Sequence, residues 1–484
     1  MVRDMLAEPR SGSSKGRARR PRTLVILIAV AGVLMAQSVV WSARAASGPC
    51  QPPRCVQGSV TVGDEHIPFN VVLPVDYATS ARHYPVVYLL HGGLAGQNQW
   101  LGDGIEAFTG NLPPSQEAIV VLPSSAFGIW LDWQNGNHLD ETALLHLLVP
   151  YIDAQYRTIP DRDHRAIAGL SAGGFGSLQD AAHRPDLFAA VGSFSGLDDV
   201  TDPVVEAALV SLGPAVSALC TVQPSNSVTR CANNTGTQDV LPPSAAGNPL
   251  TDQLWFHAHN PGDLAVNYRG MSVWLSSGNG TPCDSNTVTG DPQGTVAGGI
   301  LEAGLIRRTH LELDSDLTAA GIPHTDVYWG CGDGHVPYLQ QDLTQWWQVM
   351  INAMGRTSPR AFDYRSSDAT FSVWGWDFAA DPGRAREFLT AQGASAAGVG
   401  LTGSGLTTIT TAPLFVPRTV VSLRGATASS ATADPNGRIT FQVDLGPPHT
   451  LQEYTAQATA AEAIANTTST GYFVSRAVQF SGTT

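Results

Sequence analysis

Residues 165–182 read RAIAGLSAGGFGSLQDAA. A short apolar run at 165–168 leads into Gly169-Leu170-Ser171-Ala172-Gly173, and a stretch of small residues at 172–182 then favours a helix. A serine between two glycines, in a sharp turn from strand to helix, is the arrangement called a nucleophile elbow. Glycine is needed on either side because a Cβ would strike the neighbouring strand or helix. The pattern predicts that Ser171 stands clear of a sheet as a nucleophile.

The first 45 residues have the pattern of a signal peptide. Four arginines between 17 and 22 precede an uncharged apolar run at 24–40, and Ala43-Arg44-Ala45 follows as a cleavage site of the small-x-small type. We therefore expect export, with maturation near Ala45 and no lasting membrane insertion. An uncleaved membrane anchor is the alternative, since the run is long enough to span a bilayer.

Removal of residues 1–45 would leave a strongly acidic chain. That segment holds eight of the 27 basic residues but only two of the 41 acidic residues, so the remainder has a net charge of −20. Such a chain is repelled by nucleic acid and by anionic membrane surfaces, and neither is expected as a partner. Lys15 is the only lysine, which excludes Schiff-base, pyridoxal-phosphate and P-loop chemistry from the mature protein. We expect no cofactor and no metal.

Six cysteines follow the signal segment, and an even number in an exported chain favours three disulfides. The spacing suggests Cys50 with Cys55 and Cys220 with Cys231 as short-range pairs. Cys283 and Cys331 each follow an expected strand and could join two strand ends. Buried free thiols are the alternative.

Strand and helix patterns alternate along the first 355 residues. We expect strands at 59–62, 67–73, 85–90, 118–122, 165–168, 189–195, 271–276 and 325–329. We expect helices at 139–156, 172–182, 298–320 and 338–354. This alternation predicts a mostly parallel central sheet with helices on both faces, in one domain at 46–355.

Two other segments differ in character. Residues 196–270 are rich in Pro, Asn, Ser and Gly, and so long a stretch inside a compact domain is usually a cap or lid. After a linker at 355–360, residues 361–484 alternate Thr, Val and Ser with small residues, which predicts a small β-sandwich of open role. Trp374 and Trp376 could form a sugar-binding platform there, although aromatic residues in strands usually belong to the core.

A serine hydroxyl is a weak nucleophile, so Ser171 needs a base and a carboxylate that orients the base. His335 is the expected base, because it lies in the loop after the last expected strand. Two carboxylates preserve the order nucleophile, acid, histidine. Asp284 follows the strand at 271–276, and Glu302 lies near the start of the next helix. Position alone slightly favours Asp284.

An oxyanion hole requires two backbone N–H groups aimed at the developing negative charge. Ala172 follows the nucleophile directly and supplies the first. The second is expected from His91-Gly92-Gly93, which follows an apolar strand and resembles the His-Gly-Gly loops of esterases; Gly93 is the predicted donor. A plain glycine turn is the alternative reading of this loop.

Several short blocks between residues 60 and 354 together resemble the antigen 85 mycolyltransferases and the wider esterase D group of α/β-hydrolases. The blocks are Tyr88-Leu89-Leu90, Leu131-Asp132-Trp133, Gly169-Leu170-Ser171, Gly278-Asn279-Gly280-Thr281-Pro282, Leu301-Glu302 and Gly334-His335. In that family the acid is the glutamate of the leucine-glutamate pair, and here Glu302 precedes His335 by 33 residues. The resemblance therefore implies an α/β-hydrolase fold and favours Glu302 over Asp284.

The resemblance also places His91 and Trp133 at the substrate site. The transferases, however, carry an aspartate and an arginine that grip trehalose where this chain has His91 and Leu94. Pro337 stands where the family has a tryptophan after the histidine. These departures concern the acyl acceptor rather than the fold or the acyl-serine chemistry.

The expected function is that of a secreted serine carboxylesterase with the triad Ser171, Glu302 and His335. Its substrate would be a small-molecule or lipid ester, including a cell-envelope glycolipid. The first alternative is an acyltransferase that moves an acyl chain to a cell-envelope sugar or lipid. The second is an inactive hydrolase fold that only binds.

Overall fold

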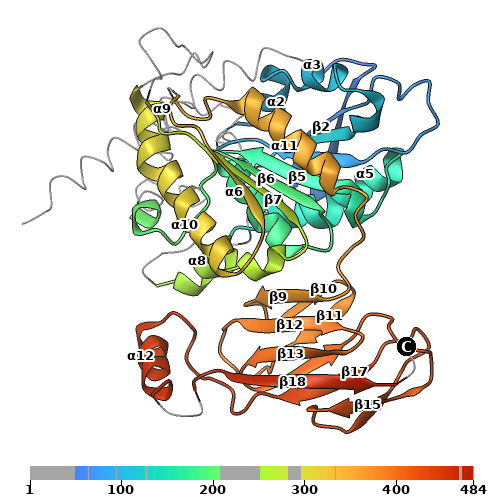
Figure 1. Ribbon diagram of the computed structural model, residues 1–484, viewed down its shortest axis with the longest axis vertical. Helices are drawn as coiled ribbons and strands as arrows, with labels where there is room; N and C mark the ends of the chain where they lie inside the picture. Colours follow the sequence, from blue (N-terminus) through green and yellow to red (C-terminus); the bar gives the residue numbers. More distant parts are fainter. Residues whose placement is uncertain are drawn as a thin grey trace, which may run out of the picture.

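The computed structural model describes residues 50–482 apart from 64, 94, 126–128, 135, 137, 208–250, 282–295, 333 and 468–470. Figure 1 shows a sheet flanked by helices, and below it a second part made almost entirely of strands. The predicted fold class, an α/β-hydrolase with an additional C-terminal β domain, is confirmed.

The large sheet has eight strands in the order β1-β2-β4-β3-β5-β6-β7-β8. From β4 onward neighbouring strands run parallel, whereas β2 runs antiparallel to both β1 and β4. Strands β3 to β6 are buried over their full length and are apolar apart from Arg165 and Ser193, as expected for a sheet covered on both faces. The strands are β1 (Cys55–Val62), β2 (Glu65–Val72), β3 (Val86–Leu90), β4 (Ile119–Pro123), β5 (Arg165–Leu170), β6 (Ala190–Phe194), β7 (Ser272–Ser277) and β8 (His324–Tyr328).

Helices cover both faces of this sheet. Alternate residues of β3 face opposite helical layers. Tyr88 belongs to the hydrophobic cluster that also contains residues of η2, α5, α6 and α10, and Leu89 belongs to the cluster that contains residues of α2, α3 and α11. The helical segments are α2 (Gln99–Gly102), α3 (Ile105–Gly110), η1 (Pro114–Gln116), α4 (Asp140–Thr142), η2 (Ala143–Leu148), α5 (Val149–Gln155), η3 (Arg162–His164), α6 (Ala172–His183), α8 (Gln253–His259), η5 (Ala265–Tyr268), α9 (Val296–Leu301), η6 (Glu302–Ile306), α10 (Arg307–Ala319) and α11 (Leu339–Ala353).

The two long helices expected at 139–156 and 298–320 each contain a π-helical segment, η2 and η6. A π turn inserts one extra residue and rotates the side chains that follow, and such turns are frequent at functional sites. Hydrophobic periodicity does not report this local change. Glu302 is the first residue of η6.

The C-terminal β domain contains a four-stranded sheet, β10-β11-β14-β17, and a six-stranded sheet, β16-β15-β18-β13-β12-β9, both antiparallel. Its elements are β9 (Phe362–Ser366), β10 (Thr370–Val373), β11 (Trp376–Ala379), β12 (Leu389–Ser395), β13 (Gly398–Gly403), β14 (Leu406–Thr410), β15 (Val420–Arg424), β16 (Ser430–Thr432), β17 (Thr440–Asp444), α12 (Ala456–Ala465) and β18 (Val474–Ser481).

Residues 371–378 alternate apolar and polar side chains in a way that predicts one strand, but the structure forms two strands joined by a turn. Trp374 and Gly375 have φ values of 52° and 76° and turn the chain between β10 and β11. Two consecutive residues with positive φ are typical of a tight hairpin turn, and a tryptophan there is unusual. Trp376 is buried in the core, and Trp374 stacks on Phe362, so neither forms an exposed sugar platform.

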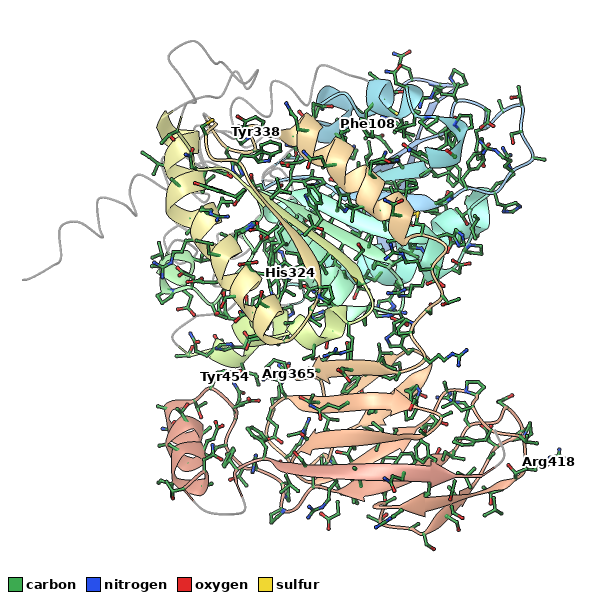
Figure 2. All side chains as sticks on the ribbon, viewed as in Figure 1. Phe108, His324, Tyr338, Arg365, Arg418 and Tyr454 are labelled. Atoms are coloured by element: carbon green, nitrogen blue, oxygen red, sulfur yellow. A yellow bond between two sulfur atoms is a disulfide. The ribbon has the colours of Figure 1, made fainter. Side chains whose placement is uncertain are left out.

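The β domain contacts the α/β domain through a small set of specific contacts. The carboxamide of Asn267 accepts a hydrogen bond from Arg365 N (2.7 Å) and donates to Arg365 O (3.0 Å) and to Ala182 O (2.9 Å). The hydroxyl of Tyr364 donates to His183 O (2.8 Å). Tyr454 stacks on His257 with ring centroids 3.6 Å apart. Figure 2 shows Arg365 and Tyr454 at this junction.

Replacement of Asn267 by alanine is expected to destabilise the protein by about 3 kcal/mol, because it removes three hydrogen bonds to backbone groups, the part-buried N–H and C=O of Arg365 and the buried C=O of Ala182. The measurement is the midpoint of thermal unfolding, with Asn111→Ala, which removes an exposed asparagine, as the control. An Asn267→Ala midpoint equal to that of the control would show that these contacts do not hold the two domains together.

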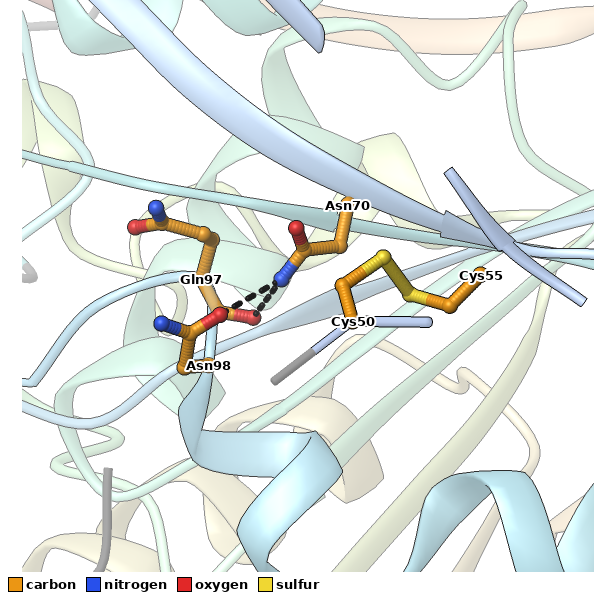
Figure 3. The surroundings of a disulfide bond; sticks show 5 residues. All are labelled: Cys50, Cys55, Asn70, Gln97 and Asn98. Carbon is orange, nitrogen blue, oxygen red and sulfur yellow. Dashed lines mark hydrogen bonds between the residues drawn. A yellow bond between two sulfur atoms is a disulfide. The ribbon is translucent and has the colours of Figure 1, made fainter. Parts of the chain in front are cut away.

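One predicted disulfide is confirmed: Cys50 and Cys55 are bonded, and Figure 3 shows them near Asn70 of β2, which donates to Asn98 Oδ1. Cys331 is also disulfide-bonded. Its predicted partner Cys283, the expected pair Cys220 and Cys231, the signal segment and most of the expected lid lie outside the described residues. None of the helices within the described part of the chain has the length and apolarity needed to cross a membrane.

Candidate active site

Ser171 occupies the turn between β5 and α6, with φ 56° and ψ −125°. A non-glycine residue in this region is strained and is held by its surroundings. A Cβ on Gly169 would lie 2.2 Å from Gly173 O, and a Cβ on Gly173 would lie 2.5 Å from Leu90 O. Both glycines of the motif are therefore required by close backbone packing, and the elbow has the predicted form.

His335 and Glu302 are in direct contact. His335 Nδ1 lies 2.7 Å from Glu302 Oε2, and because a carboxylate only accepts hydrogen bonds, Nδ1 carries the proton. Both residues are buried. Burial raises the pKa of Glu302, but hydrogen bonds from His335, Gly278 N and the Ser195 hydroxyl outweigh it and hold the pKa below its ordinary value. Glu302 is thus an ionised carboxylate that fixes the tautomer of His335.

Ser195 connects this pair to the elbow. Its hydroxyl donates to Glu302 Oε1 (2.8 Å), and its N–H donates to Ser276 O (2.9 Å). The preceding residue, Phe194, accepts from Ser171 N at 2.9 Å. Ser195 follows β6 directly and is itself strained, with φ 46°. The ends of the neighbouring parallel strands β5, β6 and β7 thus place Ser171, Ser195 and Gly278 at one edge of the sheet, and Ser195 and Gly278 hold the carboxylate that contacts His335.

Ser195→Ala is expected to lower kcat about tenfold, because one hydrogen bond to the carboxylate is lost and the pKa of Glu302 rises. Ser193→Ala is the matched control: its hydroxyl is equally buried and donates to Asp198 (2.6 Å) rather than to Glu302. The measurement is kcat for ester hydrolysis by both variants. Equal kcat values for the two variants would mean that the hydrogen bond from Ser195 to Glu302 does not contribute to catalysis.

The ring of His91 fixes the candidate oxyanion loop, His91-Gly92-Gly93. Burial lowers the pKa of His91 to about 4, so its ring is neutral. Nε2 accepts from Ser125 N (3.0 Å), so Nδ1 carries the proton and donates to Gly92 O (2.8 Å). In a trans peptide the C=O and the following N–H point in opposite directions, so the Gly93 N–H points away from His91. The Gly92 N–H is bound to Gln99 Oε1 at 2.8 Å. Gly93 is therefore the better candidate donor of the two.

Two residues expected to contact substrate, His91 and Trp133, are buried instead. His91 is fully enclosed and uses both ring nitrogens within the protein. Trp133 is 2% exposed, and its ring packs edge-on against His138 at 4.3 Å. The expectation is corrected: both residues support the loops around the site, and a sequence resemblance does not report exposure.

Two other candidate residues, Asp284 and Leu94, lie outside the described part of the chain. Sequence reasoning missed Ser195, for which a small polar residue at a strand end is the only signal. It also missed Trp130, whose indole N–H donates to His91 O (3.1 Å). Among the described residues, no group of three or more His, Cys, Asp or Glu is arranged to hold a metal ion.

Comparison with known proteins agrees with this geometry. Residues 60–286 match the family described as "Putative esterase". Esterase Rv1288 of Mycobacterium tuberculosis is 31% identical over 262 residues, which cover 53% of this chain and 50% of that protein. The chain thus spans about half the length of this esterase relative.

Further similarities involve two feruloyl or ferulic acid esterases and a mycobacterial protein. An endo-1,4-beta-xylanase/feruloyl esterase of Xylanibacter ruminicola is 30% identical over 149 residues, covering 28% of this chain and 20% of that protein. Among solved structures, a ferulic acid esterase has 22% identity and a TM-score of 0.44, covering 62% of this chain and 98% of that chain. Mycobacterium tuberculosis MPT51 (FbpC1) has 19% identity and a TM-score of 0.43, covering 62% and 99%.

Proposed function

We propose that the protein is a secreted serine carboxylesterase with Ser171, His335 and Glu302 as its catalytic residues. The observation that carries the proposal is the 2.7 Å contact between His335 and the ionised Glu302, at the sheet edge where the strained elbow presents Ser171. An imidazole whose Nδ1 proton is held by a carboxylate can act as a base through Nε2.

The reaction follows from these roles. His335 Nε2 takes the proton of the Ser171 hydroxyl as Oγ attacks the ester carbonyl, and the N–H groups of Gly93 and Ala172 stabilise the oxyanion. His335 then gives the proton to the leaving alcohol as the acyl–oxygen bond breaks. Water attacks the acyl-serine in the same way and releases the acid. The imidazolium formed in each step is stabilised by Glu302.

The same proposal includes export and the substrate class. It also includes a catalytic domain at 46–355, a cap within it at 196–270, and a separate β domain at 361–484. The substrate is a small-molecule or lipid ester. A panel of p-nitrophenyl esters of increasing chain length, with a feruloyl ester added because one relative is named a feruloyl esterase, would define the acyl group. Release of acid and alcohol is the expected result. Failure of the folded protein to cleave any of them would favour a binding role.

Transfer to a sugar is the second candidate, supported by the resemblance of the elbow and His335 blocks to mycolyltransferases. The same assay with and without trehalose separates the two, because hydrolysis yields free acid and transfer yields acylated trehalose. We expect free acid, since His91 is buried where the transferases have a trehalose-gripping aspartate. Acylated trehalose as the main product would reverse this order.

A further inference from the structure

Trp329 lies between β8 and the loop that carries His335, and the proposed mechanism does not use it. Its indole N–H donates to Asp342 Oδ1 at 2.8 Å. Its ring stacks on Tyr338, with centroids 4.4 Å apart and planes 21° from parallel. Trp329 and Tyr338 stand at the two ends of the loop, so their contact closes it. Figure 2 shows Tyr338 at the start of α11, at the end of the α/β domain away from the β domain.

Backbone hydrogen bonds hold both ends of this contact in place. The backbone N–H of Trp329 donates to Ser277 O (2.9 Å). Gly278, the residue after Ser277, donates its backbone N–H to Glu302. Asp342 lies in the first turn of α11, is 1% exposed, and donates through its own N–H to Tyr338 O (2.8 Å). The Trp329 side chain thus ties the end of β8 to the helix that follows the loop.

The loop itself needs such restraint. Val336, directly after His335, has φ 56°, a strained conformation for a β-branched residue. Strain of this kind persists only where neighbouring contacts hold it. The stack and the indole hydrogen bond join the loop ends and limit the positions that the imidazole can take.

We propose that Trp329, Tyr338 and Asp342 form a clasp that positions His335 for proton transfer to and from Ser171. The three are positioning residues, and the inference rests on the proposed function. Burial raises the pKa of Asp342 to about 7. The clasp uses Oδ1 as the acceptor of the indole N–H, and asparagine keeps an acceptor oxygen that can take this position.

Trp329→Phe tests the clasp because phenylalanine keeps a ring for stacking but lacks the N–H. We expect kcat and the acylation burst with p-nitrophenyl acetate to fall about tenfold, with KM within about twofold, because a small misplacement of a catalytic group slows chemistry more than binding. Asp342→Leu, which removes the acceptor, should reproduce this loss. Asp342→Asn, which keeps Oδ1, should restore kcat to near the wild-type value.

Trp347→Phe is the matched control. Trp347 lies on the same helix, is fully buried and donates its indole N–H to Gln116 O (3.1 Å), away from the His335 loop. It should lower thermal stability and leave kcat unchanged. If Trp329→Phe keeps kcat, or loses no more than Trp347→Phe, the clasp proposal is overturned. A folded wild-type protein that hydrolyses no p-nitrophenyl ester would instead overturn the proposed function.

Discussion

Ser171→Ala is expected to reduce kcat/KM by about 10⁴-fold or more, because no other hydroxyl can replace the nucleophile and only binding and the oxyanion hole remain. The fold should persist. Alanine keeps the Cβ that the elbow already accommodates, and the backbone contacts from Ser171 N to Phe194 O and from Gly174 N to Ser171 O do not involve the hydroxyl. The measurements are steady-state hydrolysis of a p-nitrophenyl ester and the thermal unfolding midpoint.

Ser177→Ala is the control for this experiment. Ser177 lies six residues further along α6, is fully buried, and donates its hydroxyl to Gly173 O at 2.7 Å. This variant should lose some stability and keep most of its activity. Retention of substantial activity by Ser171→Ala would mean that another residue forms the acyl intermediate.

Glu302→Gln is expected to reduce kcat by about 10³–10⁴-fold, the second largest effect. The carboxylate accepts from three donors: Gly278 N and Ser195 Oγ on Oε1, and His335 Nδ1 on Oε2. A carboxamide has one acceptor oxygen, so its NH₂ group must face at least one of these donors. In one orientation of the amide the hydrogen bond that fixes the His335 tautomer is lost. In the other, the hydrogen bonds from Gly278 N and Ser195 Oγ are lost.

The comparison with Asp284→Asn decides between the two candidate acids. Asp284→Asn is expected to retain most of the wild-type kcat in the same assay, since the contact of His335 with Glu302 already supplies the carboxylate. If Asp284→Asn were the more damaging variant, the acid would have to be reassigned.

Much of the α/β domain could be predicted from the sequence, because its central strands are largely apolar runs and its elbow has a fixed glycine spacing. The position of His335 followed from the order of strands, since the ends of parallel strands meet at one edge. The choice of Glu302 did not follow from position, which slightly favoured Asp284. It needed the resemblance to a known family.

Other features of the fold could not be predicted from the amino-acid sequence. The positive φ values of Ser195, Val336 and Trp374 arise from tertiary contacts, and no local residue preference predicts them. The hairpin at Trp374 was therefore missed. The burial of His91 was also missed, because its ring is enclosed by Ser125 and Trp130, from segments more than 30 residues away.

Covalent labelling with a fluorophosphonate, followed by peptide mass spectrometry, tests the central claim that Ser171, His335 and Glu302 act at one site. The account predicts a single adduct on the peptide that contains Ser171, with a labelling rate that falls by about 10³-fold or more in His335→Gln. A folded wild-type protein that takes up no label, carries it on another residue, or reacts equally fast without His335 would contradict the account.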